Sequence, residues 1–119
     1  MEFPVKEPLK LDDGKHVGKI KRVEYKEEPY KYTDVFIQPT GSDMEIKYGC
    51  PSNVTSITKL GKLIAKFAEL KVGTNVDPEK ILVGKEVSFL TITEEAKDGN
   101  SYIRIVDGSV KPHPQVEKV

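Results

Sequence analysis

The stretch SITKLGKLIAKFAEL, from Ser56 to Leu70, predicts the one amphipathic helix of the chain. Its apolar residues recur at intervals of three and four, which brings them to one side of a helix. These residues are Ile57, Leu60, Leu63, Ile64, Phe67 and Leu70, with Lys71 at the end of the same stripe. Thr55 or Ser56 can cap the first turn, and Gly73 can end the helix. The helix should therefore cover an apolar core with one side.

Two further features of this stretch predict how the helix packs. Gly61 lies inside it, where glycine costs up to about 1 kcal/mol relative to alanine, so we expect a close approach to a neighbouring strand there. Lys59, Lys62 and Lys66 fall away from the apolar stripe and are expected to form a solvated face.

Short strands are predicted on both sides of the helix. Three runs precede it, at Lys15–Tyr25, Tyr32–Gln38 and Met44–Cys50, and two follow it, at Lys85–Thr93 and from Ser101 onward. The second and third runs alternate apolar and polar residues, which predicts an antiparallel hairpin with one apolar face. The first run changes phase close to Gly18, which predicts a β-bulge or a sharp bend. Ahead of the fourth run, Asp77 and Pro78 predict a short, capped helical turn.

The order strand, strand, strand, helix, strand, strand is that of the OB-fold, a five-stranded Greek-key barrel that is partly open. In such a barrel the helix closes one end over the core, and the first strand bends to serve both sheets. We therefore predict an all-β protein with one main helix: an OB-fold domain at 12–111, an extended arm at 1–11 and a flexible tail at 112–119. A barrel or sandwich of another topology with an incidental helix is the alternative.

Composition limits the function classes. The 119 residues are enough for one domain, and 19 basic residues balance 19 acidic ones, for a formal net charge of zero. Proteins that bind nucleic acid without sequence preference usually carry a basic excess, although charge can also be segregated on one face. The sequence has no apolar run of membrane-spanning length and no signal-peptide core near its start. The predicted location is the cytoplasm, or the host cytoplasm if the protein is viral.

Residues that usually carry catalysis or bind metals are sparse. Cys50 is the single cysteine, and His16 and His113 are far apart in sequence, so the usual four-ligand zinc site is not available. The sequence contains no HExxH, no CxxC and no glycine-rich phosphate loop. We therefore expect no enzyme activity, no metal and no cofactor. Cys50 is interpreted as a half-buried small apolar residue, with a catalytic thiol as the alternative.

Three phrases of the sequence are informative together: YKYTDVFIQ, the capped helix SITKLGKLIAKFAEL, and VDPEKILVGKEVSFLTI. In these phrases, and over Leu11 to Lys111 as a whole, the chain resembles OB-fold single-stranded DNA-binding proteins of phage and archaeal-virus type. The resemblance implies a module that binds single strands in replication, recombination or repair and has no catalytic centre. The neutral net charge and the absence of tryptophan depart from that pattern.

OB-folds bind oligonucleotides across the second and third strands, between the loops that join strands one and two and strands four and five. Single-strand binders stack bases on aromatic rings and follow the phosphates with basic side chains. The predicted site therefore comprises Tyr25, Lys26, Tyr30, Lys31, Tyr32, Phe36, Lys47, Tyr102 and Arg104. Lys19, Lys21 and Arg22 could extend the positive track along the first strand.

Each of these side chains also has a structural interpretation. Loop tyrosines often cover a barrel edge, Phe36 could lie in the core, and Arg104 could form a surface ion pair with an acidic neighbour such as Glu94. Two functions follow from the same residues. One is binding of single-stranded DNA, or RNA; the other is a protein-interaction or assembly module that uses the same tyrosine-rich patch. The expected partners are a single strand, a second copy of the chain, or a replication or recombination protein.

Overall fold

The computed structural model describes residue 2 and residues 12–113. Apart from residue 2, the predicted arm at 1–11 lies outside these residues, as does the predicted tail from residue 114 onward. The described part is an antiparallel sheet with two short helices, which confirms the all-β class. The strands are β1 (Gly14–Lys26), β2 (Tyr32–Pro39), β3 (Ile46–Pro51), β4 (Glu86–Glu95), β5 (Ser101–Ile105) and β6 (Lys111–Pro112), and the helices are α1 (Lys59–Ala65) and α2 (Pro78–Leu82).

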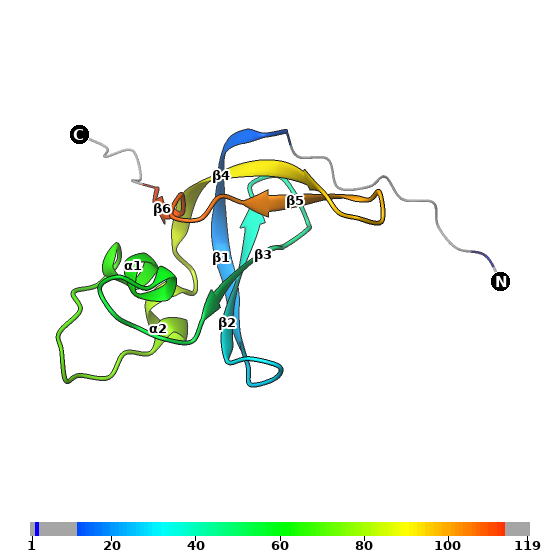
Figure 1. The fold of residues 1–119 in the computed structure, drawn as a ribbon. Coiled ribbons are helices and arrows are strands. Elements are labelled where there is room, and N and C mark those ends of the chain that lie inside the picture. The colour runs from blue at the N-terminus through cyan, green and yellow to red at the C-terminus, as the bar shows by residue number, and fades with distance from the viewer. Residues whose placement is uncertain (1, 3–11, 114–119) are drawn as a thin grey trace, which may run out of the picture.

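The long strand β1 organises the sheet. The strand order is β3-β2-β1-β4-β5, so β1 pairs with β2 on one side and with β4 on the other. Its first half pairs with β4 and its second half with β2, and β4 and β5 cross the upper end of the other three strands (Figure 1). The two end strands of this order, β3 and β5, contact each other. The sheet is therefore curved strongly around its interior.

The β-bulge that the sequence predicted in β1 is confirmed. The register against β2 shifts between Ile20 and Arg22, where the pattern changes phase from Gly18 and Ile20 to Val23 and Tyr25. This shift lets Ile20 and Val23, three residues apart, both point into the core. Gly18 itself allows close strand packing, because a Cβ at this position would lie 2.5 Å from the carbonyl oxygen of Gln38.

Helix α1 is shorter than the predicted Ser56–Leu70 at both ends: it ends at Ala65 with Lys66 as its C-cap, not at Gly73, and it begins late because the chain before it folds back. A Cβ on Gly61 would lie 1.8 Å from the carbonyl oxygen of Thr55, so the close approach is to the preceding loop and not to a strand. Residues 55–57 therefore cannot continue the helix, and Thr58 caps it by accepting a hydrogen bond from the Gly61 N–H at 3.1 Å. Ile57, predicted to face the core, is 79% exposed.

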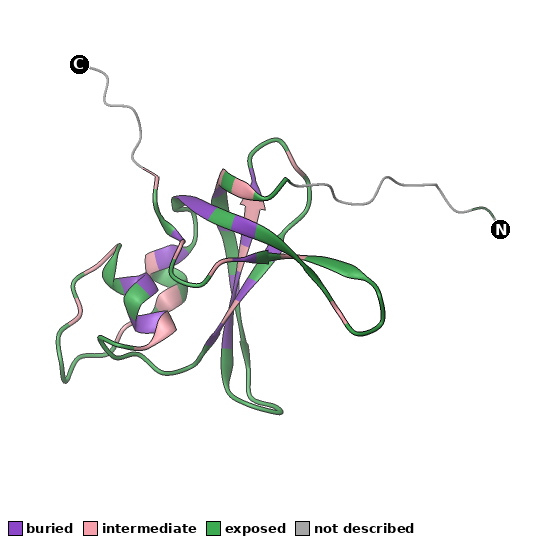
Figure 2. Cartoon of the chain, turned by 45° about the horizontal axis from the view of Figure 1, so that its top comes forward, coloured by how far each residue is buried: buried purple, intermediate pink, exposed green. Residues whose placement is uncertain are grey.

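Both helices cover one side of the core (Figure 2). The apolar side of α1 buries Leu60, Leu63 and Ile64 and contacts β3, while α2 buries Leu82 and contacts β1. From the strands, the core takes Ile20, Val23, Val35, Ile37, Ile46, Tyr48, Cys50, Val87, Phe89 and Ile105, and Val110 joins it from the loop before β6. Neither helix in the described part of the chain is long and apolar enough to cross a membrane.

The predicted turn before β4 is confirmed as α2. Asp77 caps it by accepting hydrogen bonds from the N–H groups of Glu79 and Lys80, and Pro78 occupies the first helical position. The predicted tail, however, begins too early. Its residue Pro112 pairs with β4 as part of β6, so the sheet extends past the predicted domain end at residue 111.

Candidate functional site

The outward side of β1, β2 and β3 carries most of the residues predicted to bind a ligand. On β2, Val35 and Ile37 are fully buried, so the alternating residues of that strand point outward. Cross-strand register then forms two neighbouring rows, Arg22–Phe36–Lys47 and Glu24–Asp34–Gly49, and beside them Tyr32 lies opposite Lys26 of β1. We call the surface made by Arg22, Glu24, Lys26, Tyr32, Asp34, Phe36, Lys47 and Gly49 the β1–β2–β3 face.

At the centre of this face, Arg22 covers Phe36. The guanidinium carbon lies 3.8 Å from the centroid of the Phe36 ring, a cation–π arrangement. The Arg22 Nε donates a hydrogen bond of 2.9 Å to Glu45, and its Nη1 pairs with Glu24. The hydrogen bond to Glu45 raises the pKa of Arg22 above its ordinary value. Phe36 is thus an outward, half-buried ring, as predicted, with a guanidinium plane stacked on it.

A second ion pair lies one row away. Asp34 is only 2% exposed although it points outward, and its Oδ2 lies 3.0 Å from the Lys26 Nζ. Among the described residues, this ion pair is the only polar contact of Oδ2. The interaction with Asp34 raises the pKa of Lys26. Lys26 therefore neutralises the buried Asp34 carboxylate, and a ligand could bind Lys26 only by competing with Asp34.

The Tyr32 ring lies beside Gly49, a strand position that has no side chain. A Cβ on Gly49 would meet the Tyr32 ring at an ordinary 3.6 Å but would lie only 3.1 Å from the Asp34 carboxylate, so glycine leaves room for Asp34. The Tyr32 side chain remains partly exposed at the edge of the face. The sequence predicted Tyr32 as a site residue. It could not predict that Gly49 lies beside Tyr32 and Asp34, because this depends on the register between β2 and β3.

Charges on this surface nearly cancel. Three basic side chains, Arg22, Lys26 and Lys47, share it with the carboxylates of Glu24 and Asp34 and with nearby Glu45. Only Lys47 of the three basic residues has no ion pair within the part of the chain that the structure describes. A polyanion could contact Lys47 directly, but at Arg22 and Lys26 it would have to displace the carboxylate partners.

The residues predicted on β5 extend the outward surface beyond β3. Tyr102 and Arg104 alternate with the inward Ile103 and Ile105, and β5 contacts β3. The Tyr102 hydroxyl donates to the Asp98 carboxylate at 3.3 Å. Arg104 forms an ion pair with Glu94 on β4, which agrees with the structural interpretation of this arginine.

The remaining predicted residues are less closely grouped. Tyr25 points to the other side of β1, in phase with Val23, and lies near the first turn of α2. Burial raises the pKa of Tyr25, and so do the carboxylates of Asp77 and Glu79, whereas a hydrogen bond with the Glu79 backbone lowers it; the net shift is upward. Tyr30 and Lys31 lie exposed in the loop after β1, and Lys19 and Lys21 are exposed on β1 itself. Tyr25 is thus not part of the β1–β2–β3 face.

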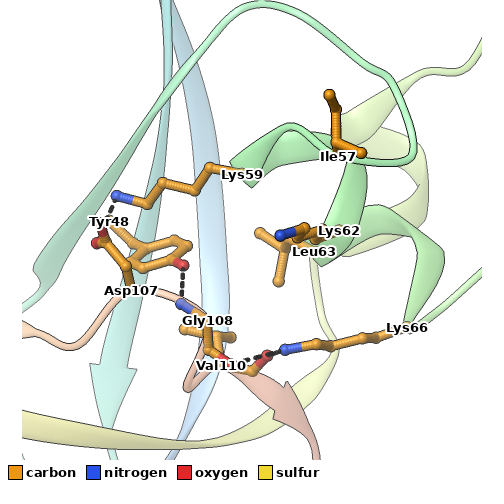
Figure 3. A pocket seen from close by; sticks show the side chains of 9 residues that line it. All are labelled: Tyr48, Ile57, Lys59, Lys62, Leu63, Lys66, Asp107, Gly108 and Val110. Atoms are coloured by element: carbon orange, nitrogen blue, oxygen red, sulfur yellow. Dashed lines mark hydrogen bonds and ion pairs between the residues drawn. The ribbon is translucent and has the colours of Figure 1, made fainter.

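A hollow of about 300 Å³ lies between α1 and the loop of residues 106–110 (Figure 3). Lys59 lies 2.9 Å from the Asp107 carboxylate and 4.3 Å from the centroid of the Tyr48 ring. Lys66 donates hydrogen bonds to the carbonyl oxygens of Gly108 and Val110, at 3.0 and 2.6 Å. The expectation that the helix lysines form a solvated face is therefore wrong for Lys59, which the 106–110 loop partly buries. Lys62 and Lys66 are exposed as predicted, although the Lys66 ammonium is bound by this loop.

Groups with catalytic or metal-binding chemistry do not converge in the described residues. Cys50 is buried in the core, and burial raises the pKa of its thiol to about 11. The His16 ring packs near Phe89 and contacts the backbone carbonyl of Asp12. Within residues 12–113, no three His, Cys, Asp or Glu side chains form a group that could hold a metal ion.

The chain was compared with models of known protein families and with curated proteins. No protein-family model matches the chain, and no curated protein matches it.

Proposed function

We propose that the protein is an OB-fold module that binds single-stranded DNA on the β1–β2–β3 face. The fold part of the proposal is supported by three observations: β1 pairs with both β2 and β4, the end strands β3 and β5 contact each other, and α1 lies between β3 and β4 in the chain. Together they support the connectivity of a partly open Greek-key barrel of the OB type. The ligand surface of that fold is the outer side of its second and third strands, which here is β2 and β3.

The row Arg22–Phe36–Lys47 carries the functional part. It presents an aromatic ring between two cationic side chains on three adjacent strands. Bases stack on aromatic rings and on guanidinium planes, while ammonium groups neutralise phosphates, so such a row fits a single strand without reading its sequence. Tyr32 on β2 and Tyr102 on β5 supply further exposed rings on either side.

The ion pairs of the face set the expected strength of binding. Arg22 and Lys26 are already paired with carboxylates, so the net gain from each phosphate contact is small. Binding should therefore be modest, should weaken as salt rises, and should depend strongly on stacking.

A titration followed by fluorescence anisotropy tests this proposal. A labelled single-stranded oligonucleotide and a duplex of equal length are each titrated with the full chain at low and moderate salt. We expect binding that prefers the single strand and weakens with salt. Failure to bind the single strand at low salt, or equal binding of the duplex, contradicts the proposal.

The second candidate function is a protein-interaction module that uses the same face. Its supporting observation is the pairing of Arg22, Lys26 and Arg104 with acidic residues, which leaves a nearly neutral surface with exposed tyrosines. Such surfaces are typical of protein interfaces. If the oligonucleotide does not bind, this function becomes the better explanation of the face.

A further inference from the structure

The hollow between α1 and the 106–110 loop is lined by three lysines and by apolar side chains. Lys59, Lys62 and Lys66 follow one another at intervals of three and four residues, so α1 and its C-cap present all three to the hollow (Figure 3). The single carboxylate that lines it is Asp107. The lining therefore carries a formal charge of plus two, from three lysines and one aspartate. In a chain with no net charge, this is a marked local excess.

The three lysines differ in how their charge is compensated. Lys66 is fixed by two backbone carbonyls, which are neutral, and burial and the nearby Lys111 lower its pKa. Lys59 is paired with Asp107, whose side chain is itself 61% exposed, so another carboxylate could take the place of Asp107. Lys62 forms no ion pair among the described residues. The hollow can thus accept an additional negative group.

The walls favour a peptide over a nucleic-acid strand. Ile57 stands at the hollow although it is 79% exposed, and Leu63 and Val110 form apolar lining beside it. The only aromatic ring of the lining, Tyr48, is 3% exposed, so it offers no surface on which a base could stack. A small concave site with apolar walls and lysines suits a carboxylate-rich segment that also carries an apolar side chain.

We propose that this hollow binds a short acidic segment of a partner protein, with its carboxylates on Lys62 and Lys59 and an apolar side chain against Ile57. The hollow shares no residue with the β1–β2–β3 face. The proposal is therefore independent of single-strand binding, and the protein could hold both ligands at once. Electrostatic attraction would make the interaction sensitive to salt.

The test uses the full chain and a fluorescein-labelled peptide in which pairs of aspartates alternate with leucines. Its counterpart has asparagine in place of each aspartate. We expect the acidic peptide to bind at low salt and the asparagine peptide to bind far more weakly. Lys62→Glu should weaken binding by about tenfold or more, because it places like charges together, and Ile57→Ser should weaken it severalfold. Both positions are exposed, so neither change should impair folding.

Lys80→Glu is the matched control, since Lys80 is an exposed helix lysine of α2 outside the hollow. It should leave peptide affinity within about twofold of the parent chain. Equal weakening by Lys62→Glu and Lys80→Glu would overturn the proposal, as would absence of peptide binding at low salt. A loss of oligonucleotide binding in Lys62→Glu, with peptide binding unchanged, would assign the hollow to nucleic acid and also overturn it.

Discussion

The guanidinium of Arg22 lies 3.8 Å from the centroid of the Phe36 ring and is held there by Glu45 and Glu24. This arrangement uses the same two groups that a single strand would need, the ring for a base and the guanidinium for a base or a phosphate. The carboxylates therefore act as competitors of the ligand. Their removal should have the opposite effect to removal of the basic or aromatic residues.

Glu45→Gln should strengthen binding of a single-stranded oligonucleotide severalfold. The change removes the negative charge of the group that accepts the 2.9 Å hydrogen bond from Arg22, so a phosphate would compete for the guanidinium with the Glu24 carboxylate alone. Each additional phosphate contact steepens the slope of log affinity against log salt by about 0.7 for a single strand. Anisotropy titrations across a salt series measure both quantities. Glu69→Gln, an equal charge change at an exposed position after α1, should have little effect.

If Glu45→Gln and Glu69→Gln raise the affinity equally, the effect comes from net charge alone, and the competition between Glu45 and the ligand is refuted.

Tyr32→Leu should weaken single-strand binding, whereas Tyr25→Leu should not. Tyr32 points outward beside Gly49, while Tyr25 points to the opposite side of β1 and lies near α2. A stacked base is worth about 1–3 kcal/mol, so the loss for Tyr32→Leu should be about fivefold or more if one base stacks there. The comparison is made at constant salt by anisotropy. Equal losses of affinity in both variants would contradict the prediction, because they would show that the side of the sheet on which a tyrosine lies does not decide whether it binds the strand.

The sequence predicted the strands well because alternation reports directly on burial. Val35 and Ile37 alternate with Phe36, and the structure buries the first two and leaves Phe36 half-buried on the outer face. The ion pairs could not be predicted in the same way. Lys26 and Asp34 meet across two strands, and their contact depends on a register that the bulge between Ile20 and Arg22 sets.

Helix α1 illustrates a second limit of sequence patterns. Periodicity places Ile57 on the apolar stripe, but it does not report that the Thr55 backbone occupies the space beside Gly61. The same loop geometry moves the cap to Thr58. The lysines of the helix were likewise expected in solvent, because the 106–110 loop that binds Lys59 and Lys66 is distant in sequence.

Gly61→Ala should destabilise the protein, although alanine is normally the better helix residue by about 1 kcal/mol. The new Cβ would lie 1.8 Å from the Thr55 carbonyl oxygen, so the loop or the helix must move. Such overpacking typically costs about 1–3 kcal/mol of unfolding free energy. Urea unfolding followed by circular dichroism measures it. Lys62→Ala in the same helix should stay within about 0.5 kcal/mol, and a stabilised Gly61→Ala variant would contradict the packing of residues 55–57.

Cys50 should be unreactive in the folded protein at pH 8. Its thiol is buried, which raises its pKa from an ordinary value of 9.0 to about 11, and the thiolate is the reactive form. Alkylation by iodoacetamide should therefore be more than about a hundredfold slower in the native protein than in the same protein in denaturant. Mass spectrometry of quenched samples gives both rates. Comparable rates would instead support the alternative of an accessible, activated thiol.

The same shift predicts a pH dependence of stability with a definite sign. The folded state holds the Cys50 proton more tightly than the unfolded state, whose thiol has the ordinary pKa of 9.0. Below that pH the thiol is mostly protonated in both states and stability is unaffected, and stability should fall as the pH rises from about 9 toward 11. Other groups titrate in this range, so the parent chain is compared with Cys50→Ala, which lacks this contribution. The stability advantage of the parent should shrink by about 2–3 kcal/mol over that interval, and a constant difference would show that Cys50 ionises equally in both states.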